Sequence, residues 1–171
     1  MGIQADIRDE LKKETVTKIH GQPTSHVLTI LKKELIAILA GIPMALGGGN
    51  FGHVGVIMDV TAYSTMTNGI AFKNPANPGV YPAGLAANAA ATICARAEAE
   101  HKELINQFET FEGVRQGVKD LILEAVDNEY LIEIEHETLG YLNQTPRQML
   151  DHLLARGGAL DFADTKVLLA E

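Results

Sequence analysis

Apolar residues recur every three to four positions along two stretches of the chain, and this spacing predicts amphipathic α-helices. The first stripe consists of Leu28, Leu31, Leu35 and Ile38. Pro23 and then Thr24 or Ser25 precede it, and a hydroxyl at that place can cap free backbone N–H groups. Gly41 and Pro43 follow, in the order in which helices usually end. The pattern predicts one helix between Thr24 and Gly41.

The second stretch lies in the later half of the chain. Residues 83–99 are rich in alanine, which favours helix. Gly113 and Gly117 interrupt the stripe that follows. They either divide it into two helices or allow another helix to approach closely. The stripe itself is formed by Leu104, Phe108, Phe111, Val118, Leu121 or Ile122, and Ala125.

Three further segments have weaker helical patterns. Residues 3–14 predict a short polar helix, and residues 1–17 could serve as a flexible or assembly arm. Residues 128–141 predict another helix, with Leu131, Ile134 or Ile132, and Leu139 directed inward. Residues 160–171 begin a further amphipathic helix.

The clearest local signal surrounds Pro146. Thr145 is an N-cap residue, Pro146 suits the first helical position, and Gln148 can complete a capping box. Gly157-Gly158 ends this helix. Its apolar positions are Met149, Leu150, Leu153 and Leu154.

The middle of the chain, residues 41–84, predicts an ordered segment rich in loops. Residues 47–49 are three glycines and predict a turn. Residues 51–60 mix β-branched residues with glycine, so they predict either a short strand of a β-hairpin or a buried helical turn. Residues 74–82 contain three prolines and cannot form a helix. The whole chain, 1–171, is predicted to be one mainly α domain of five or six helices.

Composition and charge exclude several classes of function. The chain has 171 residues, 46% of them hydrophobic, and a net charge of −8. A general nucleic-acid binder needs a basic face, which this balance disfavours. No apolar run approaches the roughly 20 residues of a membrane span, and we expect no membrane partner. The start of the chain lacks the apolar core of a signal peptide. These features predict a soluble, intracellular domain.

The charge is unevenly distributed. Residues 35–97 carry only Asp59, Lys73 and Arg96, whereas residues 98–171 carry six basic and sixteen acidic residues. The nearly neutral segment also holds nine of the sixteen glycines and four of the six prolines. Such a segment is too apolar for a free linker. It is expected to cover the chain's own helices or a partner.

Two Glu-x-x-His pairs are the main candidate for metal chemistry. On a helix, residues three apart share a face, and ferritin-like di-iron sites use two such pairs. Only 31 residues separate His101 from Glu133, which leaves little room for an intervening helix and its turns. The alternative is that both pairs are solvated helix faces. The candidate ligands are Glu98, His101, Glu133 and His136.

Other chemistry has little support. The glycine-rich segment before His53 lacks the Lys-Ser or Lys-Thr of a phosphate loop. Cys94 is the single cysteine, so the chain forms no intrachain disulfide, and a small buried thiol is its usual role. The chain is therefore not expected to be an enzyme or to need a cofactor.

Several segments in order resemble the Gag-like, capsid-type proteins of Copia-type LTR retroelements, as found in protist and algal genomes. The similarity extends over about residues 18–171. Its segments are KIHGQP at 18–23, GGNFGHVGVIM at 48–58, PGVYP at 78–82, LILEAVDNEY at 121–130 and TPRQMLDHL at 145–153.

This resemblance implies a capsid-like helical bundle that self-associates around an RNA genome. It supplies no catalytic residues for this region. Family members often carry a zinc knuckle for RNA, which this chain lacks, so RNA binding would require parts absent from it. The resemblance implies that the partner is a second copy of the chain, in cytoplasmic virus-like particles or other assemblies. A fragment, a processed product or a domesticated remnant would each fit.

Aromatic residues in the neutral segment are candidates for the assembly interface, because aromatic side chains dominate many interfaces. The alternative is that they fill the core of the chain's own fold. The candidates are Phe51, Tyr63, Phe72 and Tyr81.

Overall fold

The computed structural model describes residues 2–44, 51–81 and 90–157. Within these ranges the chain is mainly α-helical and contains five α-helices and no strand, with one isolated bridge between His136 and Gly140. The elements are α1 (Ile3–Leu11), α2 (Ser25–Ala40), η2 (Val54–Val56), α3 (Val60–Met66), α4 (Ala91–Ala125), η3 (Asn128–Tyr130), η4 (Ile132–Ile134) and a helix at 146–157.

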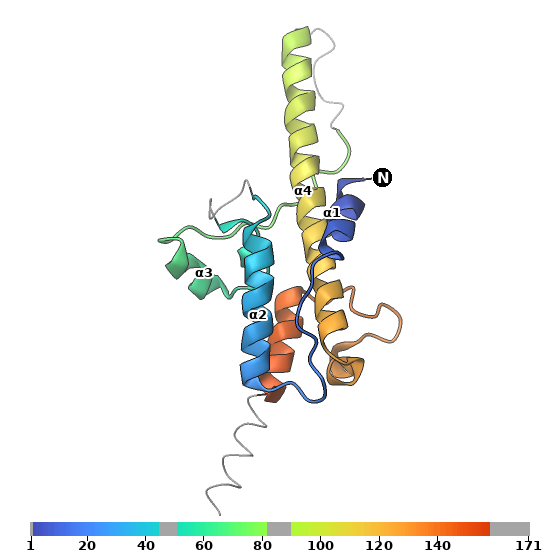
Figure 1. Ribbon diagram of the computed structural model, residues 1–171. Helices are drawn as coiled ribbons and strands as arrows, with labels where there is room; N and C mark the ends of the chain where they lie inside the picture. Colours follow the sequence, from blue (N-terminus) through green and yellow to red (C-terminus); the bar gives the residue numbers. More distant parts are fainter. Residues whose placement is uncertain (1, 45–50, 82–89, 158–171) are drawn as a thin grey trace, which may run out of the picture.

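The core lies where α2, α4 and the helix at 146–157 run side by side (Figure 1). η2 closes it at one end with Val54 and Ile57. The predicted stripe of α2 is confirmed, except that Leu39 rather than Ile38 is fully buried. The other deeply buried side chains of these helices are Leu28, Leu31, Leu35, Val114, Val118, Leu121, Ile122, Met149, Leu150 and Leu153.

Helix α4 is continuous through Gly113 and Gly117, so the close-approach alternative is confirmed. A Cβ on Gly113 would lie 2.7 Å from the Gln4 carbonyl oxygen, and one on Gly117 would collide with Leu11. Helix α1 therefore rests directly on α4. Within residues 1–17, suggested above as a flexible or assembly arm, α1 packs on α4 and buries Leu11.

A second close approach joins η2 to the end of α2. Gly52 has a φ of +54°, and a Cβ there would lie 2.5 Å from the Ile42 carbonyl oxygen. The next residue, His53, is buried; its backbone N–H donates to Leu39 and its Nδ1–H donates to the carbonyl oxygen of Ile42 at 2.8 Å. Residues 51–60 thus form helical turns, one of the two predicted alternatives.

The predicted helix over residues 128–141 is wrong. The chain instead makes two 3₁₀ turns, η3 and η4, and a tight turn at Gly140 with a φ of +59°. Leu131 is fully buried as expected, but Leu139 is 39% exposed. Arg156 secures these turns by pairing with Glu133 at 3.2 Å and by lying over the Tyr130 ring.

The capping box before Pro146 is confirmed. The Gln148 backbone N–H donates to Thr145 Oγ1 at 3.1 Å, and the Thr145 N–H donates to Gln148 Oε1 at 2.8 Å. None of the helices in the described ranges is long and apolar enough to span a membrane. The predicted turn at 47–49, residues 83–89 of the alanine-rich helix, the Gly158 helix end and the helix at 160–171 lie outside the described residues.

Candidate functional site

Two of the four candidate interface aromatics meet inside the fold. Tyr63 of α3 is only 1% exposed, and its ring packs edge-on against Phe72 with 5.3 Å between centroids. Phe72 in turn packs against Phe111 of α4 at 6.3 Å. Tyr63 and Phe72 therefore help to close the chain's own core, the second of the two alternatives drawn from the sequence.

The other two candidates lie apart from this cluster. Phe51 is half-buried. Tyr81 is also half-buried and packs edge-on against His101 of α4, with 5.4 Å between ring centroids. The neighbouring Val80 is 92% exposed. The four aromatic residues do not form one continuous surface.

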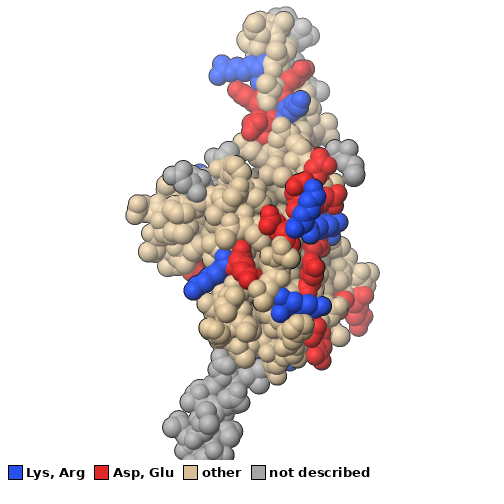
Figure 2. Space-filling view, in the orientation of Figure 1, with Lys and Arg blue, Asp and Glu red and all other residues tan. Residues whose placement is uncertain are grey.

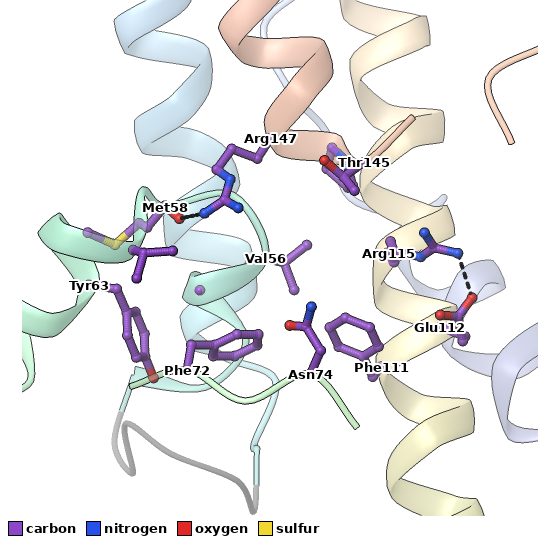
Figure 3. Close-up of a pocket in the computed structure, with 13 residues that line it drawn as sticks. Val56, Met58, Tyr63, Phe72, Asn74, Phe111, Glu112, Arg115, Thr145 and Arg147 are labelled. Atoms are coloured by element: carbon purple, nitrogen blue, oxygen red, sulfur yellow. Dashed lines mark hydrogen bonds and ion pairs between the residues drawn. The ribbon is translucent and has the colours of Figure 1, made fainter. Parts of the chain in front are cut away.

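The aromatic cluster forms one wall of a cavity of about 450 Å³, which we call the arginine cavity (Figure 3). Four segments enclose it: the η2–α3 region, residues 72–74, α4 and the start of the helix at 146–157. Gly55 is required here, because a Cβ at this position would collide with the Phe72 ring. The apolar lining includes Val56, Tyr63, Phe72 and Phe111.

Two arginines supply the charge of the arginine cavity. Arg147 Nη1 donates to the Met58 carbonyl oxygen at 3.1 Å, which ties the helix at 146–157 to the segment after η2. Arg115 Nη2 donates to Glu112 at 2.9 Å, and its buried Nε has no acceptor among the described residues. With one carboxylate and two guanidinium groups, the lining carries a net charge of +1 (2 − 1) in a chain of net −8.

A third cation lies one helical turn beyond Arg115. Lys119 is 3% exposed, and its ammonium donates to the backbone carbonyls of Tyr141 at 2.7 Å and Gln144 at 3.2 Å. Burial, with the neighbouring charge of Arg115, lowers the pKa of Lys119. The lysine holds the 141–144 turn on α4, next to the cap at Thr145.

The four candidate metal ligands do not come together. Glu98 and His101 lie on the first turns of α4, whereas Glu133 and His136 follow its far end, and Glu98 is about 40 Å from Ala125 along the helix. Glu133 pairs with Arg156, and His136 Nδ1 accepts the Thr138 N–H. Across the described ranges, no group of three or more His, Cys, Asp or Glu residues could hold a metal ion.

The first part of α4 stands away from the core. None of residues 91–110 is buried, although they form about 30 Å of helix. We call this stretch the projecting half of α4; its first turns extend beyond the rest of the described chain in Figure 1, and Tyr81 packs against His101 farther along it. Ile93 and Leu104 are 55% and 51% exposed, and eleven residues apart they share one face of the helix.

A second exposed surface surrounds α3. Residues 51–72, the neutral lobe, carry Asp59 as their single charged residue. Figure 2 shows acidic and basic side chains along α1 and α4, whereas the side of the molecule that carries α3 is almost free of them on this face. Val60 is 64% exposed and Ile70 is 50% exposed.

Sequence reasoning missed the arginine cavity. Arg115 and Arg147 are isolated basic residues in an acidic third of the chain, and no spacing links them to Phe72. The available signal was Gly55, whose missing side chain makes room for the Phe72 ring. Comparisons of this chain with protein-family models, curated proteins and solved structures found no match.

Proposed function

We propose that the chain is a self-assembling structural protein, of the Gag-like capsid type that its sequence resembles, whose copies build homo-oligomeric shells, tubes or filaments. The observation that carries this proposal is the projecting half of α4, which contributes no buried residue to the chain's own core. The partner that we assign to it is a second copy of the chain.

The physical reason is that the projecting half of α4 exposes apolar side chains, although Tyr81 packs against His101 within it. Most helices in proteins are stabilised by burying one apolar face against a neighbour rather than by the helical preference of their residues. Ile93, Ala97 and Leu104 form such a face on the projecting half of α4. Small residues such as Ala97 allow the backbones of two helices to approach closely. A partner helix along this face would remove Ile93 and Leu104 from water.

An antiparallel pairing of two projecting halves is self-complementary. With the twofold axis between Glu98 and Ala99, Ile93 of one copy lies opposite Leu104 of the other. The same register brings Arg96 of one copy within reach of Glu103 of the other, and opposite charges along a helix seam favour one alignment. Within one chain, Arg96 already pairs with Glu100 at 3.2 Å.

A twofold contact alone closes into a dimer, so an extended assembly needs a second surface. We assign this role to the neutral lobe. It can meet a neighbour without charge repulsion, and it exposes Val60 and Ile70. Repetition of two weak contacts gives a stable assembly through multivalency. The proposal gives the chain no catalytic role, places it in cytoplasmic assemblies and leaves RNA binding to parts outside this chain.

The first experiment is light scattering after size exclusion at several protein concentrations, with negative-stain imaging of any large species. We expect species that grow with concentration and form shells, tubes or filaments. A monomer of about 18.4 kDa at every concentration would contradict the proposal.

Paired substitutions then separate the two surfaces. Ile93→Glu with Leu104→Glu should abolish the α4 contact, and Val60→Glu with Ile70→Glu should leave dimers that assemble no further. Ile132→Glu with Leu142→Glu is the matched control, because these residues are 61% and 58% exposed elsewhere on the chain. Arg96→Glu should weaken the dimer, and adding Glu103→Arg should restore it. Equal effects of the control and surface pairs would contradict the assignment.

A further inference from the structure

The arginine cavity has the size and composition of a small-molecule site. Its volume of about 450 Å³ lies within the range of known ligand pockets, and such pockets combine apolar walls with a few fixed polar groups. Here Phe72 and Phe111 supply aromatic surface, and two arginines and Asn74 supply the polar groups (Figure 3).

The donors of the arginine cavity exceed its acceptors. Arg147 has five N–H groups, and among the described residues its side chain donates one hydrogen bond, to the Met58 carbonyl. The Arg115 side chain donates to Glu112, and its Nε lacks an acceptor within the same part of the chain. The ligand that completes this arrangement carries acceptors and a negative charge.

The apolar side chains that line the arginine cavity determine which class of anion fits it. The fork of a guanidinium group matches the two oxygens of a carboxylate in one plane. An inorganic phosphate would satisfy the charge, but it would leave the surface of Phe72, Val56 and Phe111 without a contact. A flat apolar body attached to the carboxylate covers these side chains, and offset or edge-on packing of aromatic rings adds to the gain from burial.

We propose that the arginine cavity binds a small organic carboxylate with a flat apolar body. The carboxylate pairs with Arg147, the apolar body packs against the cavity side of Phe72 and Phe111, and Arg115 and the Asn74 amide line the cavity beside the ligand. This site goes beyond the assembly proposed above: its lining residues lie outside the projecting half of α4, although Val60 belongs both to the cavity lining and to the neutral lobe.

The test is isothermal titration calorimetry of the full chain with three probes: 2-naphthoate, its uncharged isostere 2-naphthamide, and inorganic phosphate. We expect 2-naphthoate to bind with a Kd of about 1 mM or tighter. We expect the amide to bind at least about tenfold more weakly, because it lacks the charge. Phosphate alone should give no measurable heat of binding.

Variants locate the binding. Arg147→Gln keeps a donor for the Met58 carbonyl and should weaken 2-naphthoate at least about tenfold, with Arg96→Gln on the projecting half of α4 as the control. Asn74 is exposed, so Asn74→Asp should not affect folding, and its added negative charge should weaken binding about fivefold. Asn77→Asp makes the same change outside the cavity and should have no effect.

Four results would contradict the proposal. The first two are an absence of 2-naphthoate binding and an equal affinity of the chain for 2-naphthoate and 2-naphthamide. Binding that Asn74→Asp and Arg147→Gln leave unchanged would place the ligand elsewhere. Tight binding of phosphate alone would assign the arginines to a different anion class. Calorimetry measures ligand binding and light scattering measures assembly, so failure of one proposal is distinguishable from failure of the other.

Discussion

The ammonium group of Lys119 in α4 donates a 2.7 Å hydrogen bond to the backbone carbonyl of Tyr141, 22 residues later in the chain. Gln144 provides a second carbonyl at 3.2 Å. The buried charge is thus surrounded by carbonyl oxygens, and Asp120 and Glu112 add favourable charge from α4. This contact fixes the turn that leads into the cap at Thr145, and so it also positions Arg147.

Lys119→Met should destabilise the chain. The substitution keeps an apolar stem but leaves two carbonyl oxygens without their donor, and an unsatisfied buried polar group costs about 1–3 kcal/mol. Urea denaturation should show this loss in the free energy of unfolding. Lys102→Met, at an exposed position of α4, is the control and should change stability by less than about 0.5 kcal/mol. Equal stability of the two variants would mean that the buried bonds contribute nothing.

Gly113→Ala should also destabilise the chain, against the usual preference of helices for alanine. Alanine gains about 1 kcal/mol over glycine inside a helix. Here its Cβ would lie 2.7 Å from the Gln4 carbonyl oxygen and 2.9 Å from Ile7 Cβ, so α1 must move. Overpacking of this kind typically costs about 1–3 kcal/mol.

The measurement for Gly113→Ala is urea denaturation together with limited proteolysis near α1. We expect a lower free energy of unfolding and faster cleavage before residue 12. Gly41→Ala is the control, because a Cβ there meets the Ile38 carbonyl oxygen at an ordinary 3.4 Å. A Gly113→Ala variant more stable than the original chain would show that α1 does not rest on α4 as described.

Capping residues and apolar spacing in the sequence correctly predicted α2 and the helix at 146–157, whose ends are fixed by nearby residues. Thr24 accepts a hydrogen bond from the Val27 N–H, and the Thr145–Gln148 box closes as its sequence indicates. Both elements carry their caps and apolar stripes within about four turns of chain. The mainly helical class followed from such segments. Helix α3 has seven residues, too few for a periodic signal, and Asp59 caps it with a side chain that the sequence analysis did not use.

Tertiary contacts determine the features that the sequence did not predict, namely the conformation of residues 128–141 and the arginine cavity. Residues 128–141 have helical spacing, but the chain turns after Ala125, whose carbonyl oxygen accepts a hydrogen bond from the Ile19 N–H. Arg156 then holds η4 through Glu133. The arginine cavity could not be predicted for a similar reason. Arg115 and Arg147 belong to different helices, and only the packing of those helices brings them to one cavity.

The ion pair between Arg8 and Asp120 should contribute modestly to the docking of α1. It is bidentate, with nitrogen–oxygen distances of 2.6 and 2.9 Å, and this bond raises the pKa of Arg8. Its side chains are 43% and 29% exposed, so solvent screens the attraction. A double-mutant cycle with Arg8→Gln and Asp120→Asn should give a coupling of about 0.5–1 kcal/mol.

Salt provides the check on this coupling. In about 1 M NaCl the Debye length is about 3 Å, and the coupling between Arg8 and Asp120 should fall. The pair of Lys13 and Glu10, with both side chains 70% exposed, is the control and should couple more weakly than Arg8 and Asp120 at low salt. A coupling that equals the control pair would mean that α1 docks through the contacts of Ile7 and Leu11 with α4 and not through this ion pair.

His53 should make the fold sensitive to acid. Burial lowers its pKa, and this effect outweighs the opposing hydrogen bond to the Ile42 carbonyl. Because the unfolded chain takes up a proton near pH 6.5 and the folded chain resists it, the free energy of unfolding should fall as pH drops below about 6.5. The loss is about 1.4 kcal/mol for each unit by which the folded pKa is lowered, and it stops growing below that pKa. Urea denaturation between pH 8 and pH 5 measures this loss of stability.

His53→Asn keeps a donor for the Ile42 carbonyl and should lose less stability over this range than the original chain. His20→Asn, at an exposed site, should behave like the original chain. Parallel pH curves for the original chain and His53→Asn would show that protonation of His53 does not oppose folding.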